Sequence, residues 1–294
     1  MAVRRRGAGR GAAGVLGALA LGLAAVLGCS GCSGTGAAAE DGAAGGAAEG
    51  PGEGEVRRDA RAQEGQEARE AVRRVADRLA GAGSSQARTA MQMASGGTRV
   101  TLHGEGGFDY AGRVGELRVT LPEGRTVTEV FTPGRLYMKN RGAGVPPEKW
   151  VQVETAALPD GNLVTGGATD PVTAAALLRG VRSAEDLGLA EVDGRRLRHY
   201  RGVTDIGDAA RAAPDAEARR QLTAALGGFT ESRVPFDLYV DAEGLPRKVR
   251  HHFSFAGDDR RPIDVASTVL LHDFGTPVDV TLPQPSDVYA GAVA

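Results

Sequence analysis

From residue 86 onward, the chain consists mostly of short segments in which apolar and polar residues alternate, separated by turns rich in Gly, Pro or Asn. Alternation with a period of two is typical of β-strands that bury one face. Most connections are too short for parallel crossovers, so the strands must run antiparallel. The expected strands cover residues 86–93, 98–102, 115–121, 126–131, 135–139, 149–154, 195–203, 234–240, 246–255, 263–274 and 278–282. A long antiparallel meander therefore dominates the expected fold.

Three helical segments accompany the strands. Residues 66–79 carry small and aliphatic side chains at helical spacing, with charged residues on the opposite face. An apolar helix is predicted to begin after Asp170, a good N-cap, with Pro171 at its first position, and to run toward Val181. An Ala-rich third segment spans 208–226 and is interrupted by a proline. The predicted class is α+β: a curved antiparallel sheet covered by a few helices, an arrangement that can enclose an apolar cavity.

The N-terminus has the features of an export signal. Four arginines among the first ten residues precede an uncharged stretch over 11–28 that is diluted by glycine and makes a poor permanent membrane span. Val26-Leu27-Gly28 ahead of Cys29 resembles the bacterial lipobox, which marks a cysteine for acylation. We therefore expect a lipoprotein signal peptide over 1–28, and a lipid anchor such as palmitate on Cys29 at the extracytoplasmic face of the cell membrane.

Alternatives to this interpretation remain. Cys32 is a weaker candidate for acylation, because the residues before it lack the aliphatic side chain at the third position upstream. The two cysteines also form a C-x-x-C pair, but it lies at no strand-to-helix junction, and acylation would consume one thiol. An uncleaved anchor and a twin-arginine export signal stay open. Beyond these two positions the chain has no cysteine, so its folded part must be stabilised without a disulfide.

Residues 29–63 are mostly Gly, Ala, Glu, Pro and Arg, and cannot bury enough apolar surface to offset the entropy of ordering. They are predicted to form a flexible tether with a reach of roughly 30–35 Å, followed by one domain over 64–294. Without residues 1–28 the chain keeps 31 basic against 37 acidic residues, a net charge of about −6. This charge argues against a nucleic-acid partner.

Motifs for catalysis or metal binding are missing from the sequence. None of the five histidines, His103, His199, His251, His252 and His272, forms a metal-ligand spacing, although a zinc site assembled by the fold stays open. The kinase-like tripeptide over 273–275 lacks every companion motif, and there is no nucleophile elbow or Walker loop. We therefore expect neither catalytic nor metal-ligating residues, and no cofactor.

The order of elements resembles the LppX/LprA/LprF/LprG family of actinobacterial lipoproteins, which have a LolA-like fold. The similar stretches are the hairpin over 236–250, the closing segment over 271–283 and the pattern over 187–194. The resemblance extends over roughly residues 66–290. Its motifs are turns and strand patterns, which are evidence for the fold more than for the function.

The resemblance implies a half-barrel wrapped around helices, with an apolar cavity that holds acyl chains of lipids or lipoglycans. It also implies lipid carriage or transfer in the cell envelope, with a possible membrane transporter as partner. From the apolar faces, the cavity candidates are Val75, Leu79, Leu178, Val181, Phe236, Leu238 and Phe253. Ordinary core packing is the alternative for each of them. The alternative function is an envelope sensor or interaction module that regulates a membrane partner, which a filled core with an exposed apolar patch would favour.

Overall fold

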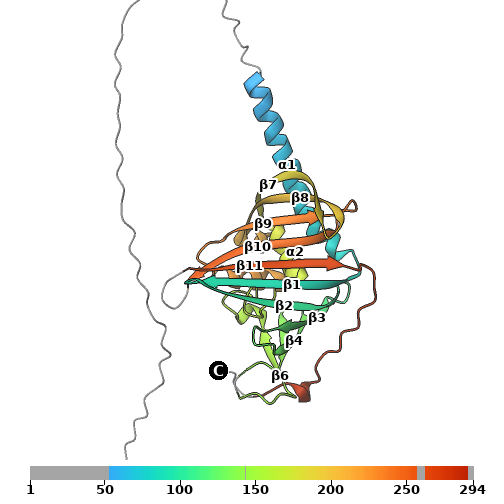
Figure 1. Ribbon diagram of the computed structural model, residues 1–294, viewed down its shortest axis with the longest axis vertical. Coiled ribbons are helices and arrows are strands. Elements are labelled where there is room, and N and C mark those ends of the chain that lie inside the picture. The colour runs from blue at the N-terminus through green and yellow to red at the C-terminus, as the bar shows by residue number, and fades with distance from the viewer. Residues whose placement is uncertain (1–52, 143, 257–261, 291–294) are drawn as a thin grey trace, which may run out of the picture. The chain divides into compact units, whose positions relative to one another are not determined.

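The computed structural model describes residues 53–142, 144–256 and 262–290 (Figure 1). The predicted signal peptide, Cys29 and the first part of the tether lie outside these residues. The helices are α1 (Glu53–Ala80), α2 (Pro171–Leu177), α3 (Ile206–Arg211) and α4 (Ala216–Ala225). Short 3₁₀ turns span Thr155–Ala157, Leu178–Gly180 and Pro285–Asp287. Among the described residues, no helix is both long and apolar enough to cross a membrane.

Eleven strands form one sheet in the order β6-β5-β4-β3-β2-β1-β11-β10-β9-β8-β7, and every neighbouring pair is antiparallel. The strands are β1 (Ser84–Ser95), β2 (Thr98–Asp109), β3 (Val114–Thr120), β4 (Thr126–Thr132), β5 (Arg135–Lys139), β6 (Trp150–Glu154), β7 (Val181–Val192), β8 (Arg195–Asp205), β9 (Arg233–Val240), β10 (Pro246–Ala256) and β11 (Pro262–His272). Two meanders, β1 to β6 and β7 to β11, join where β1 pairs with β11, as Ala87 does with Leu271. The predicted class, an α+β half-barrel of antiparallel strands covered by helices, is confirmed.

Helix α1 begins at Glu53, so residues 53–63, expected in the tether, are helical. Their Glu, Arg, Ala and Gln residues have high helix propensity, and side-chain hydrogen bonds one turn apart support this exposed part, such as Gln63 to Glu67 at 3.1 Å. Figure 1 shows this end of α1 extending beyond the sheet. Only the later turns are buried, along the apolar stripe predicted from the spacing: Ala68, Val72, Val75, Ala76 and Leu79.

Helix α2 is short because its C-terminal part becomes a strand. Asp170 caps it by accepting a hydrogen bond from the backbone N–H of Thr173 at 2.9 Å, with Pro171 at the first position, as predicted. The chain then passes through one 3₁₀ turn, and β7 begins at Val181. The apolar pattern had predicted that the helix runs on toward this residue. Strand β7 was missed because it is an edge strand with mostly exposed residues, so it lacks the alternation that reveals a strand.

Residues 278–282, expected as a strand, lie outside the sheet. The physical reason is that β11 already has a neighbour on each side, β1 and β10, so no edge is free beside it. The predicted interruption of the third helical segment is confirmed, because α3 ends at Arg211 and α4 begins at Ala216, on either side of Pro214.

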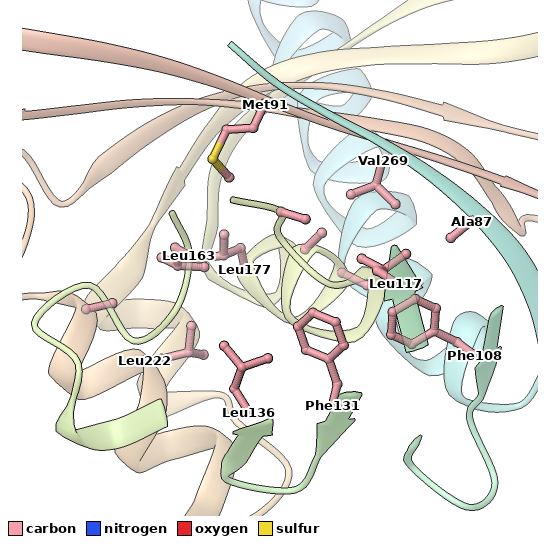
Figure 2. Packing of buried hydrophobic residues seen from close by; sticks show 14 of the residues in the cluster. Ala87, Met91, Phe108, Leu117, Phe131, Leu136, Leu163, Leu177, Leu222 and Val269 are labelled. Carbon is pink, nitrogen blue, oxygen red and sulfur yellow. The ribbon is translucent and has the colours of Figure 1, made fainter. Parts of the chain in front are cut away.

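The buried apolar side chains form two clusters. The larger cluster fills the space between strands β1 to β6, β10 and β11 on one side and helices α2 to α4 with the last turn of α1 on the other. Figure 2 shows Met91, Leu117, Phe131, Leu177 and Leu222 pointing into this common interior. The smaller cluster lies between α1 and strands β7 to β10. The helices thus cover one face of the sheet.

Candidate ligand-binding hollow

The seven cavity candidates from the sequence are all buried, with at most 3% of each residue exposed. Five of them pack together in the smaller cluster: Val75, Leu178, Val181, Phe236 and Leu238. Leu79 and Phe253 belong to the larger cluster. Two of the seven also reach the walls of surface depressions, Val75 beside α1 and Phe253 on the sheet. The structure therefore brings most of them together, but as neighbours in a packed interior.

A hollow of about 530 Å³ lies elsewhere, at one end of the larger cluster. That volume is in the range of small-molecule sites, about 300–1,000 Å³. The ends of several strands, the loop over 158–169 and the segment after α4 meet around it. Its lining is Met93, Leu102, Leu121, Arg125, Val127, Asn140, Arg141, Gly142, Pro159, Asp160, Val164, Thr165, Gly167, Gly228, Phe229 and Phe255. We call this space the hollow.

One wall of the hollow is apolar. Phe229, which follows α4, stacks on Phe253 with ring centroids 5.0 Å apart and meets Phe255 edge-on at 6.4 Å. Aliphatic side chains from β1 to β4 continue this wall, and Val164 adds to it from the loop. These side chains also pack against the larger cluster, with the outer ones only half-buried. An apolar guest in the hollow would therefore extend the existing core.

The loop over 158–169 is fixed by the carboxylate of Asp160, which lines the hollow. The donors to this carboxylate are the backbone N–H groups of Asn162 (3.1 Å), Val164 (2.8 Å) and Thr165 (2.7 Å) and the Thr165 hydroxyl (2.8 Å). Four hydrogen bonds use most of the accepting capacity of one carboxylate. Asp160 thus stabilises the conformation of the loop through hydrogen bonds within the loop itself.

Arg141, just after β5, holds the loop from its other side. Its guanidinium donates to the carbonyl oxygens of Gly166 at 3.0 Å and Thr165 at 2.8 Å. Both partners are neutral, so these bonds position the guanidinium without cancelling its charge. With 35% of its side chain exposed, Arg141 also faces the hollow.

Glu129 in β4 lies beneath this loop and is completely buried. Among the described residues neither of its carboxylate oxygens has a hydrogen-bond partner, and the closest cation is Arg141, whose Nη1 is 3.9 Å from Oε1. Burial raises the pKa of Glu129 to about 8, against the opposing charge of Arg141 and with a small contribution from Asp170. The carboxyl group is therefore mostly neutral at pH 7.

The mouth of the hollow is polar. Arg125, in the turn before β4, and Asn140, after β5, line it beside Arg141. Arg125 donates to Glu123 at 3.1 Å, but both side chains are more than half exposed, so this ion pair is weak. The hollow thus combines an apolar wall with a rim that carries two guanidinium groups.

Sequence reasoning missed the hollow. Its walls are strand ends, turns and an irregular loop, which have no periodic pattern to mark them. A fragment that hinted at it is the Gly- and Pro-rich stretch over 159–167, where apolar and polar residues mix without a period. Only the pairing of distant strands brings these segments together.

The histidines do not assemble into a second site. His199 donates from Nε2 to the carboxylate of Asp237 at 2.7 Å and stacks on Tyr239, while His251 is buried in the sheet. In the part of the chain that the structure describes, no three His, Cys, Asp or Glu side chains are grouped so that they could hold a metal ion.

The sequence matches no protein-family model and no curated protein. Among solved structures, the lipoprotein LppX of Mycobacterium tuberculosis is similar, with 10% identity, a TM-score of 0.46, and 74% of this chain and 99% of LppX covered. LprF of Mycobacterium bovis has 16% identity, a TM-score of 0.37 and coverages of 75% and 97%.

A LolA-superfamily protein of Nitrosomonas europaea is also similar, with 10% identity, a TM-score of 0.34, and 72% of this chain and 94% of that one covered. The resemblance to LppX- and LprF-type lipoproteins with a LolA-like fold, stated from the sequence, is thus found among solved structures too. It concerns the fold.

Proposed function

We propose that this chain binds acyl chains of lipids or lipoglycans in the hollow, and that it carries or transfers them at the extracytoplasmic face of the cell membrane, anchored through Cys29. The observation that supports this most is the continuity of the hollow's apolar wall with the larger cluster. Each CH₂ group kept out of water contributes about 0.8 kcal/mol, so an apolar wall strongly favours holding an acyl chain over releasing it into water. The proposed activity is non-enzymatic, needs no cofactor and leaves room for a membrane transporter as partner.

The direct test is native mass spectrometry of the purified whole chain, followed by lipid extraction and titration with a neutral fluorescent acyl probe. We expect co-purified lipid, or saturable probe uptake at about one site. Neither co-purified lipid nor uptake at micromolar protein would overturn the carrier function and favour an interaction module.

A pair of tryptophan variants locates the site. Leu121 is a half-buried residue of the apolar wall, so Leu121→Trp fills part of the hollow and should weaken probe binding about tenfold or more. Leu187→Trp introduces the same side chain on β7, where Leu187 is 41% exposed and lies outside the hollow, and should bind as the unaltered protein does. Equal binding by both variants would place the ligand elsewhere.

A third variant tests the cavity that the sequence predicted around the residues of the smaller cluster. Leu238 is completely buried in the smaller cluster, so Leu238→Trp should overpack that interior and cost about 1–3 kcal/mol of stability. If the variant folds and loses probe binding, acyl chains also occupy the space beside α1. If it folds and binds normally, the smaller cluster is core alone.

A further inference from the structure

Positively charged side chains outnumber negatively charged ones around the hollow. Its described lining holds two guanidinium groups, Arg125 and Arg141, and one carboxylate, Asp160. Asp160 accepts four hydrogen bonds from its own loop, so it has little capacity left for a guanidinium. No described carboxylate lies within a hydrogen-bond distance of Arg141.

Glu129 is the one carboxyl group positioned to neutralise Arg141, and it does so poorly. The 3.9 Å separation is longer than a hydrogen bond, and burial keeps the pKa of Glu129 near 8. The other titratable group that acts on Glu129 is Asp170, whose own pKa is raised by burial. At pH 7 the positive charge of Arg141 is therefore left without an ionised carboxylate partner among the described residues, and in a partly enclosed hollow it attracts an anion more strongly than in open water.

Building on the proposed acyl-chain function, we infer that the hollow selects an anionic amphiphile: its acyl chain lies along the apolar wall, and its negatively charged headgroup lies at the rim against Arg141 and Arg125. The guanidinium groups suit phosphate, sulfate or carboxylate oxygens, because each presents several N–H donors in one plane. A neutral lipid would contact the apolar wall but would give the two guanidinium groups at the rim no anionic partner.

The test compares dodecyl sulfate with dodecanol, both below the concentration at which they aggregate, as competitors for a neutral fluorescent acyl probe on the purified whole chain. We expect dodecyl sulfate to bind about tenfold tighter or more, because a hydrogen bond to a charged group is worth about one order of magnitude in affinity. Inorganic sulfate at the same concentration should not compete. Competition by inorganic sulfate would instead indicate a free-anion site and overturn the amphiphile assignment.

Arg141→Gln should remove most of the preference for dodecyl sulfate over dodecanol, and Arg141→Lys should restore part of it. The matched control is Arg118→Gln, the same change of charge on β3, where Arg118 is 73% exposed and points away from the hollow. If Arg141→Gln loses both competitors equally, Arg141 only fixes the loop, and the headgroup assignment is wrong. If neither competitor binds the unaltered protein, the acyl-chain function itself fails.

A pH series separates charge from shape, since sulfate stays ionised throughout. Between pH 7 and pH 9 Glu129 ionises and neutralises Arg141, so the preference for dodecyl sulfate should decrease in the unaltered protein. Glu129→Gln cannot ionise, so its preference should stay constant over the same range. The same decrease in both proteins would show that a group other than Glu129 titrates in this range, and would overturn the proposed effect of Glu129 on Arg141.

Discussion

Gly106 in β2 lies so close to Glu116 in β3 that a Cβ atom on Gly106 would be 1.9 Å from the Glu116 carbonyl oxygen. Gly202 in β8 stands in the same relationship to Ser183 in β7, with 2.0 Å. Both contacts are with backbone, which cannot rotate away as a side chain can. Glycine at these two positions is what allows neighbouring strands to approach so closely in the curved sheet.

We therefore expect Gly106→Ala to destabilise the protein by at least about 2 kcal/mol, because β2 and β3 must separate to accept the methyl group. The matched control is Gly65→Ala in α1, where a Cβ atom meets only the Ala184 carbonyl oxygen at 4.0 Å. That change should stabilise by up to about 1 kcal/mol. Denaturant unfolding of both variants measures the difference, and equal effects would contradict the close-contact argument.

The raised pKa of Glu129 makes stability fall as pH rises. In the unfolded chain this group releases its proton near 4.5, whereas the folded protein holds it until about 8. Between these values the folded state binds more protons, so its free energy of unfolding decreases with pH by up to about 1.4 kcal/mol per pH unit. Glu129→Gln should therefore gain stability relative to the unaltered protein between pH 5 and pH 8.

Unfolding free energies at several pH values check this, with Glu105→Gln, a 77% exposed side chain on β2, as control. A difference between the Glu129 variant and the unaltered protein that does not change with pH would show that this carboxyl is ionised in the folded state.

Because of His251 in β10, we expect the free energy of unfolding to change with pH in the opposite direction below neutral pH. It is 1% exposed, its Nε2 has no partner among the described residues, and burial lowers its pKa to about 3, with a small contribution from His252. The unfolded chain protonates this imidazole near 6.5, so stability should fall as pH decreases from about 6.5 to 3.

His251→Leu removes this titration, so its stability relative to the unaltered protein should rise as the pH falls from 7 to 4. Circular dichroism during urea titration at each pH gives the free energies. His103→Gln, an exposed histidine on β2, should show no such trend. If both variants follow the unaltered protein in parallel, His251 is protonated in the fold.

The anchor proposed at Cys29 is tested by fractionation. Cys29→Ala removes the thiol that acylation requires, so the protein should leave the membrane fraction of its host or lose its lipid mass. Its probe binding should be unchanged, because the hollow is built from residues of the domain. Cys32→Ala is the control and should stay membrane-bound; release of that variant alone would move the anchor to Cys32.

The sequence by itself determined most of the elements. Alternation with a period of two revealed ten of the strands, the Asp170-Pro171 pair revealed the start of α2, and the proline at 214 revealed the break between α3 and α4. These signals are local: a strand's apolar face and a helix cap are encoded within a few residues of the chain.

The tertiary structure alone decided which apolar faces meet. Periodicity marked Leu178 and Leu238 as inward-facing, but it does not encode whether the space opposite is filled, and α1 fills it. The hollow depends on the pairing of β1 with β11 and on the loop over 158–169, and the same loop covers Glu129 beside Arg141. Such long-range contacts arise from packing between segments far apart in the sequence, so no local pattern contains them.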